Sequence, residues 1–321
     1  MAIINPGLSY DPGMPYATMR RRDMLAGAAA AVAGARAAEG RSVIVLIGDD
    51  HGLELGCYGN QVVATPNLDR LAGQGTRFSH AFCTTASCSS SRSVILTGLH
   101  NHANGQYGLA HSSSNFHTLE SVESLTKLAR AAGVVTAVVG KLHVRPPSVY
   151  PWDFEWPGGL TSATRDVYSM AQAAGRFFKK AAGRPFYLHY GFSDPHRTGL
   201  GYGNDRDYPK VRKRKYSPAD VVVPGFLPDL PEVRQDLAGY YESVDRLDQG
   251  VGMLLEELEK SGRAKDTLIV YLGDNGMPFP GGKASFYDSG HRLPLIVSSP
   301  AQARRGVVNN AMVSFTDVLP T

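Results

Sequence analysis

A thiol and a guanidinium stand together at the start of an apolar segment. Residues 88–97 read Cys-Ser-Ser-Ser-Arg-Ser-Val-Ile-Leu-Thr, and Gly98 follows. We expect a helix that ends at Gly98, because glycine adopts the left-handed conformation that commonly closes helices. Free N–H groups and the helix dipole attract anions to the start of a helix, and Arg92 adds a planar fork suited to sulfate or phosphate oxygens. The segment therefore predicts an anion site beside Cys88.

Two other apolar runs, residues 42–47 and 266–272, end in acidic turns. Neither run alternates polar with apolar residues, which predicts parallel strands buried on both faces. Open α/β sheets hold ligands at the carboxyl ends of their strands, so the two turns would meet there. Their oxygen atoms would form a cage for a hard divalent cation, Ca²⁺ or Mg²⁺. The candidate ligands are Asp49, Asp50, Asp274 and Asn275.

A second pair of strand-like runs ends in basic residues. Residues 134–139 lead to Lys141 and His143, and residues 185–192 lead to His196. Lys141 and His143 lie two residues apart, so we expect them to share one side of an extended strand end. His196 follows a proline in a turn, and we expect it to be exposed. Taken singly, each of these segments is also compatible with ordinary turn chemistry.

Taken together, these segments resemble the type I sulfatases. The order Asp-Asp, Cys-x-x-Ser-Arg, Gly-Lys-x-His, Asp-Pro-His, Asp-Asn-Gly is the order of that family's site residues, and the resemblance covers nearly all of residues 41–321. In that family a maturation enzyme converts the cysteine into an aldehyde, formylglycine, which carries the nucleophile. The family usually has proline where this chain has Ser90. Other phrases, such as Met-Pro-Phe-Pro at 277–280, resemble the sulfamidases, which act on N-sulfoglucosamine in heparan sulfate.

The resemblance implies a role for each candidate residue. Hydrated formylglycine at position 88 would attack sulfur, Arg92 would orient it, and His196 would be the general acid that protonates the leaving nitrogen or oxygen. Lys141 and His143 would bind sulfate oxygens or assist proton transfer. One divalent cation, with Ca²⁺ preferred over Mg²⁺, would stabilise the attacking oxygen. Its ligands would be Asp49, Asp50, position 88, Asp274 and Asn275, and the substrate-binding residues would be Lys283, His291 and Arg292.

Two other functions are compatible with the same residues. The first is hydrolysis of a phosphonate monoester or phosphodiester, because related hydrolases use the same modified cysteine. The second is a glycan-binding protein that no longer catalyses, which Ser90 and the end of the chain suggest. The phrase at 315–321 precedes more helix and a smaller C-terminal antiparallel domain in sulfatases, so we expect that domain to be missing here.

The wider pattern predicts the fold that must position these residues. Helical patterns at 119–132, 166–182 and 233–260 alternate with the strand-like runs. Such alternation predicts an α/β fold with a doubly wound, mostly parallel sheet flanked by helices. The resemblance adds that the sheet is alkaline-phosphatase-like and that residues 40–321 form the catalytic domain.

The first 39 residues form an N-terminal extension that has the features of an export signal. Three arginines at 20–22 precede an alanine-rich apolar run and the small-residue segment 35–37. That order predicts a twin-arginine signal peptide and export to the periplasm or the extracellular space. The apolar run is shorter than the roughly 20 residues that a membrane span needs, so no stable membrane anchor is expected.

Charge and cysteine content narrow the partners. The net charge is only +4, which does not indicate nucleic-acid binding. Basic residues at 210–215 are compatible with heparin-like polyanions but are more typical of a solvated loop. Three cysteines make neither a disulfide framework nor a zinc site, and pairing of Cys57 with Cys83 stays open. A sulfated glycan is the expected substrate, and a homodimer stays open.

Overall fold

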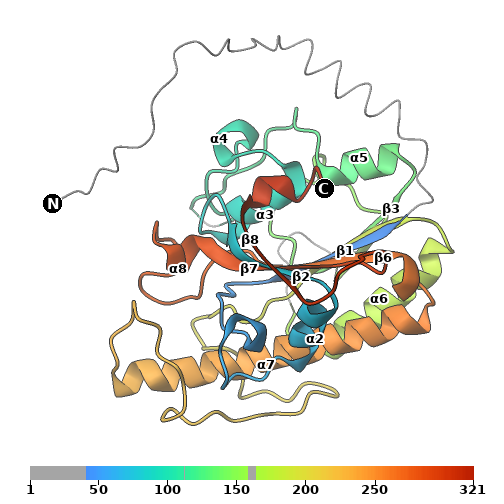
Figure 1. Ribbon diagram of the computed structural model, residues 1–321. Coiled ribbons are helices and arrows are strands. Elements are labelled where there is room, and N and C mark those ends of the chain that lie inside the picture. Colours follow the sequence, from blue (N-terminus) through green and yellow to red (C-terminus); the bar gives the residue numbers. More distant parts are fainter. Residues whose placement is uncertain (1–40, 112, 158–163) are drawn as a thin grey trace, which may run out of the picture. The chain divides into compact units, whose positions relative to one another are not determined.

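The structure, a computed structural model, describes residues 41–111, 113–157 and 164–321 (Figure 1). The predicted export signal at 1–39 lies outside the described residues. No helix in the described part of the chain is both long enough and apolar enough to cross a membrane.

The described residues form one eight-stranded mixed sheet with the order β4-β3-β5-β1-β6-β7-β2-β8. From β4 to β6 all neighbours are parallel, whereas β7 is antiparallel to β6 and to β2, and β8 is parallel to β2. The strands are β1 Ser42–Gly48, β2 Thr76–Phe82, β3 Val135–Gly140, β4 Phe154–Trp156, β5 Phe186–Gly191, β6 Thr267–Gly273, β7 Arg292–Ser298 and β8 Val307–Ser314.

Helices cover both faces of this sheet, with α2, α6 and α7 on one side and α3, α4 and α5 on the other (Figure 1). The predicted doubly wound α/β fold is therefore confirmed. The α-helices are α2 Pro66–Gln74, α3 Cys88–Thr97, α4 Asn101–Asn104, α5 Leu125–Ala131, α6 Val167–Ala181, α7 Pro231–Lys260 and α8 Asp288–His291. Short 3-10 turns are η1 Gly56–Tyr58, η2 Ala264–Asp266 and η3 Phe315–Asp317.

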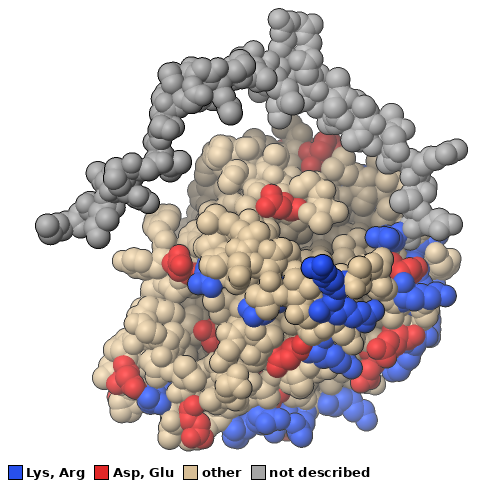
Figure 2. Space-filling model, in the orientation of Figure 1, with Lys and Arg blue, Asp and Glu red and all other residues tan. Residues whose placement is uncertain are grey.

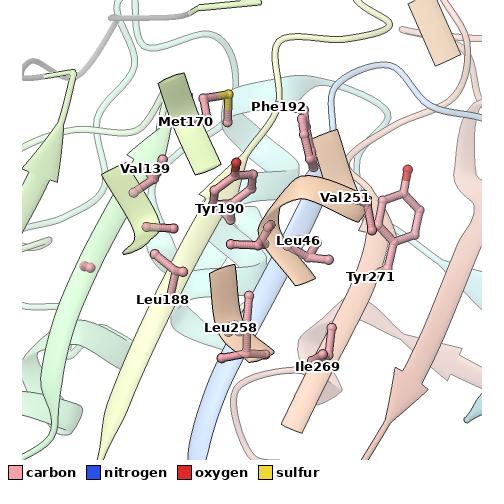
Figure 3. Packing of buried hydrophobic residues seen from close by; sticks show 14 of the residues in the cluster. Leu46, Val139, Met170, Leu188, Tyr190, Phe192, Val251, Leu258, Ile269 and Tyr271 are labelled. Atoms are coloured by element: carbon pink, nitrogen blue, oxygen red, sulfur yellow. The ribbon is translucent and has the colours of Figure 1, made fainter. Parts of the chain in front are cut away.

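Strand β1 packs on both faces because its successive side chains point to opposite sides of the sheet. Leu46 joins the cluster on the side of α6 and α7, where Met170 and Val251 also lie (Figure 3). Val45 and Ile47 join a second cluster with residues of α3. Both faces of the central strands are therefore dry, which explains why their sequences lack polar alternation.

Three of the predicted helices are confirmed as α3, α6 and α7. The fourth was predicted too long: α5 starts at Leu125 instead of Leu119. Ser124 caps it by accepting a hydrogen bond from the Lys127 N–H, and an N-cap residue fixes where a helix begins. Strands β2, β4, β7 and β8 were not predicted.

Candidate active site

Four neighbouring strands, β3, β5, β1 and β6, end at one edge of the sheet, and each ends in glycine. A Cβ on Gly191 would lie 2.0 Å from the Lys141 carbonyl oxygen and 3.0 Å from Arg92 Nη1. Only glycine permits that approach, so the strand ends can bring the following side chains close together. The terminal glycines are Gly48, Gly140, Gly191 and Gly273.

Arg92 lies in α3, and its guanidinium is fully buried between the strand ends. Its Nε donates to Asp274 Oδ2 at 2.7 Å, and its Nη1 donates to the Lys141 carbonyl at 2.8 Å. Its Nη2 lies 3.5 Å from Asp49 Oδ1. Gly98 closes α3 in the predicted left-handed conformation, with φ 65°. Arg92 thus joins the ends of β1, β3 and β6.

Asp49 is a fully buried carboxylate that pairs with the ammonium of Lys141. Burial alone would raise the pKa of Asp49, but Lys141 and Arg92 outweigh burial and hold this pKa well below its ordinary value. Asp49 is therefore ionised at neutral pH. Oxygen Oδ1 of Asp49 is buried and accepts no hydrogen bond from a described residue.

Cys88 lies at the first position of α3, with its thiol among charged groups. Its Sγ is 3.0 Å from Lys283 Nζ and 3.5 Å from Asp50 Oδ1. Burial, together with Asp49, raises the pKa of the Cys88 thiol well above its ordinary value. A thiol that stays protonated is a weak nucleophile, so burial at this site disfavours a reactive cysteine thiolate.

His196 faces the same carboxylates, although it follows β5 in the chain. Its Nδ1 lies 2.6 Å from Asp50 Oδ2 and 3.7 Å from Asp49 Oδ2. The His196 side chain is 32% exposed, so the predicted exposure is partial. Ligand atoms of four residues all lie within 4.8 Å of one another: Asp49, Asp50, Cys88 and His196.

The donor set of this cluster fits a hard divalent cation. Asn275 donates from Nδ2 to Asp50 Oδ1 at 2.9 Å, while its own Oδ1 is buried without a partner among the described residues. Two oxygens that accept no hydrogen bond from a described residue, Oδ1 of Asn275 and Oδ1 of Asp49, thus accompany the Asp50 carboxylate, and buried oxygens normally accept one. Asp274 instead accepts from Arg92 and from the Asp50 N–H.

His143 differs from its predicted geometry. Strand β3 ends at Gly140, and His143 has φ 63°, so it does not continue an extended strand end beside Lys141. Its ring stacks on His111 with 4.7 Å between ring centroids, and its Nδ1 is buried without a hydrogen-bond partner among the described residues. Burial and the charge of Lys141 lower the pKa of His143 to about 2, so the imidazole is neutral.

The three predicted substrate-binding residues have different partners. Lys283 enters the cluster and donates to Asp50 Oδ1 at 2.7 Å. Arg292 donates from Nε to the Ser79 carbonyl of β2 at 2.9 Å. His291 Nδ1 lies 3.0 Å from the Cys83 carbonyl oxygen. The substrate-binding role of His291 and Arg292 stays a prediction.

A buried ion network supports the turn that carries His196, and it was not predicted from the sequence. Arg246 of α7 donates to both carboxylate oxygens of Asp194, at 2.7 and 2.8 Å. Arg165 donates to Asp194 and to the His196 carbonyl, and the Asp194 carbonyl accepts from the Asp49 N–H at 2.9 Å. Asp194 thus anchors both the His196 turn and Asp49. The Asp-Pro-His phrase was a signal for Asp194, whereas nothing in the sequence singled out Arg246.

A cleft of about 320 Å³ borders the cluster, and Asp49, Lys141 and His196 line it. Arg206 and Tyr208 line it as well.

The sequence left open whether Cys57 pairs with Cys83. No such disulfide is present, because Cys57, Cys83 and Cys88 are all free thiols.

The chain is similar to known proteins over most of its length. Residues 41–321 match the family described as Sulfatase. The chain is 40% identical over 299 residues to human N-sulphoglucosamine sulphohydrolase, covering 88% of this chain and 60% of that relative. A solved structure of a protein with its substrate D-glucosamine-2-N,6-O-disulfate is 22% identical, with a TM-score of 0.66, and covers 88% of this chain and 76% of that one.

A phosphonate monoester hydrolase of Agrobacterium radiobacter is 18% identical, with a TM-score of 0.69, and covers 88% of this chain and 72% of that one. Likenesses at these identities show the fold alone, whereas the match to the family covers the whole described region. The chain spans about 60% of the length of its human relative. From the family match and the site together, this chain belongs to the sulfatase family.

Proposed function

We propose that this chain is the catalytic domain, residues 40–321, of a metal-dependent sulfatase that hydrolyses sulfamate or sulfate ester groups. The observation that carries the proposal is the setting of Cys88. Its thiol lies 3.0 Å from Lys283 Nζ and 3.5 Å from Asp50, where the strand ends meet. A raised thiol pKa disfavours thiolate chemistry there, which agrees with a cysteine that must be modified before it reacts.

A formylglycine at position 88 and one divalent cation would supply a nucleophilic oxygen and offset its charge. Carboxylates and an amide oxygen favour Ca²⁺ over Mg²⁺, because Ca²⁺ accepts more oxygen ligands at longer distances. The proposed cation ligands are Asp49, Asp50, Asp274, Asn275 and position 88, and His196 Nδ1 borders the same group.

The chain's own cations would bind the sulfuryl group. Arg92, Lys141 and Lys283 surround the carboxylates, and we assign them the task of orienting position 88 and of offsetting charge on the sulfate oxygens. Neutral His143 would donate one hydrogen bond to a sulfate oxygen. Asp50 holds His196 through Nδ1, which leaves the other ring nitrogen to carry a proton to the leaving group.

The substrate proposed for this site is N-sulfoglucosamine in a heparan-type glycan. The 40% identity to human N-sulphoglucosamine sulphohydrolase supports this choice over an O-sulfate. His291 and Arg292 are proposed to bind the sugar. A formylglycine-generating enzyme would act on residues 88–92, and the signal-like segment at 1–39 would direct export.

Two measurements test the proposal. Mass spectrometry of the tryptic peptide 78–92, from protein made with and without a formylglycine-generating enzyme, should find an aldehyde at position 88 only with that enzyme. Matured protein should then turn over a sulfamate faster than an aryl sulfate or a phosphonate ester. Preference for the phosphonate would replace the sulfatase assignment with phosphonate hydrolysis. Glycan binding with modified Cys88 but no turnover of any substrate would assign a non-catalytic role.

A further inference from the structure

The basic run seen in the sequence belongs to a longer charged surface segment. Residues 205–215 carry six lysines or arginines and two aspartates. Lys and Arg side chains also gather along the lower edge of the face in Figure 2, the side on which α7 lies in Figure 1. The proposed hydrolysis uses none of these cations.

Only half of these six cations form an ion pair with a described residue. Lys213 pairs with Asp207 at 2.8 Å, and the two cations that follow it pair with acids of α7 at 3.2 and 2.9 Å. The other three form no ion pair with a described residue and are exposed. An exposed cation without an ion-pair partner is available to a ligand anion. We call these three residues the basic track: Arg206, Lys210 and Arg212.

Contacts with α7 hold this segment in place. The side chain of Gln249 accepts from the Arg212 N–H at 2.8 Å and donates to its carbonyl at 2.9 Å. The guanidinium of Arg246 lies over the ring of Tyr208, 4.9 Å from its centroid. The backbone of Arg212 and the ring of Tyr208 are therefore held in place before any ligand arrives, which lowers the entropy cost of binding.

Two of the three residues of the basic track, Arg206 and Arg212, connect to the catalytic cleft. Arg206 and Tyr208 line that cleft and also line a small depression next to it. Arg212 and Lys213 line the same depression. A single extended ligand can therefore reach from His196 in the cleft along Tyr208 to Arg212.

We propose that the basic track binds the anionic groups of saccharides that adjoin the residue being hydrolysed. This inference rests on the proposed function, because it takes the occupant of the cleft to be one end of a polyanionic glycan. Carboxylate and sulfate groups repeat along such a chain, and arginine and lysine bind both. The physical continuity with the cleft favours the substrate's own chain over nucleic acid or an anionic membrane.

Binding without turnover is the first test. The full chain carrying Cys88→Ala is titrated with a heparin-derived hexasaccharide and with N-sulfoglucosamine at several salt concentrations. Lys210→Gln/Arg212→Gln should weaken hexasaccharide binding about 5-fold. It should also reduce the slope of log affinity against log salt by between about 1 and 2, since fewer counterions are released. Lys179→Gln/Arg304→Gln, which removes the same charge from exposed positions elsewhere, should change neither quantity.

Turnover by matured protein is the second test. The variant of the basic track should raise KM for the hexasaccharide about 5-fold more than KM for N-sulfoglucosamine, with little change in kcat. Because binding is measured without a nucleophile, a failed sulfatase assignment still leaves the binding result readable. A different result would overturn the proposed role of the basic track and keep the sulfatase assignment. In that result matured protein turns over N-sulfoglucosamine, but the ratio of KM for the hexasaccharide to KM for N-sulfoglucosamine is the same in Lys210→Gln/Arg212→Gln as in Lys179→Gln/Arg304→Gln.

Two other outcomes would also contradict the proposal. Equal loss of hexasaccharide affinity in the Lys179→Gln/Arg304→Gln control would mean that net charge alone attracts the glycan. The protein could also bind duplex DNA or phosphatidylserine vesicles as tightly as the hexasaccharide. If Lys210→Gln/Arg212→Gln weakened that binding by the same factor, the basic track would be a site for anions in general.

Discussion

Two charged regions of this molecule follow opposite physical rules. The first region, which we call the buried cluster, consists of the charged side chains of Arg92, Asp49 and Asp274. All three are 0% exposed, and each charge has a partner of opposite sign. In the basic track, Lys210 and Arg212 are exposed and have no ion-pair partner among the described residues. Burial makes the loss of one partner expensive, whereas water and salt screen an exposed charge.

The difference teaches where stability and function are coupled. Removing a charge from the buried cluster leaves its partners desolvated and with fewer opposite charges, so folding and chemistry should fail together. Removing a charge from the basic track leaves water in its place, so only ligand binding should change. Each prediction below tests one side of that contrast.

The largest effect is expected for Arg92→Met. Loss of the guanidinium leaves Asp274 and Asp49 buried without that cation, which should cost about 3–5 kcal/mol of unfolding free energy. Turnover should fall by more than about 1,000-fold, because position 88 loses its neighbour as well. Urea denaturation and kcat/KM measure the two losses. Lys260→Met, which breaks an exposed pair with Glu257, should change stability by less than about 0.5 kcal/mol.

Removal of the cation should have the next largest effect. Chelation should abolish turnover and lower the melting temperature, since a ligand at about 100 times its Kd adds about 2.7 kcal/mol to the folded state. Calcium should restore both quantities better than magnesium. Asp50→Asn, which removes one proposed ligand charge, should make the melting temperature less sensitive to chelation. An unchanged melting temperature in the parent protein would mean that no cation binds there.

Arg246→Met tests the buried network behind the site. Asp194 would lose two hydrogen bonds from Arg246 and keep Arg165 and Ser243, so we expect a loss of about 2–3 kcal/mol. The His196 turn should lose its position, and kcat should fall more than KM rises, by about 10- to 100-fold. Arg246→Lys should restore stability more than kcat, because lysine cannot bind both oxygens as a planar fork. If Arg246→Lys and Arg246→Met lowered kcat equally and lowered stability equally, the role of Arg246 would be purely structural.

Ser90→Pro probes the family proline at a position where it should fit. The first intrahelical bond of α3 runs from the Ser91 N–H to the Ser87 carbonyl, so residue 90 gives up no helix hydrogen bond. Its hydroxyl has no partner among the described residues. Unfolding free energy should change by less than about 1 kcal/mol. Formylglycine conversion, read by mass spectrometry, should rise, while Ser90→Ala should leave it unchanged.

The smallest effect belongs to the basic track. Lys210→Gln/Arg212→Gln should change the unfolding free energy by less than about 0.5 kcal/mol, because both side chains are exposed and unpaired among the described residues. Urea denaturation of the Cys88→Ala protein, with and without Lys210→Gln/Arg212→Gln, measures this change in unfolding free energy. A loss above about 2 kcal/mol would place these side chains in the fold instead of on the binding surface.

Much of the site's framework was predictable. Strands β1, β3, β5 and β6 are short, apolar and free of alternation, and each was recognised from its own residues. Their ends carry acids and bases in the sequence itself, so a site at the carboxyl edge followed from the rule for open sheets. Strand β7 was not predicted because Pro294 argues against a strand. Strand β2 was not predicted because it is only half-buried along most of its length.

The sequence by itself determined which residues follow each strand end and which helix begins at Cys88, because strand and helix patterns depend on neighbours in the chain. Only the tertiary structure decided which charges meet. Arg246 and Asp194 are 52 residues apart, and Arg92 and Asp274 are 182 apart. Their contacts depend on sheet order and on the packing of α3 and α7, where burial removes competing water and makes each charge require a specific partner.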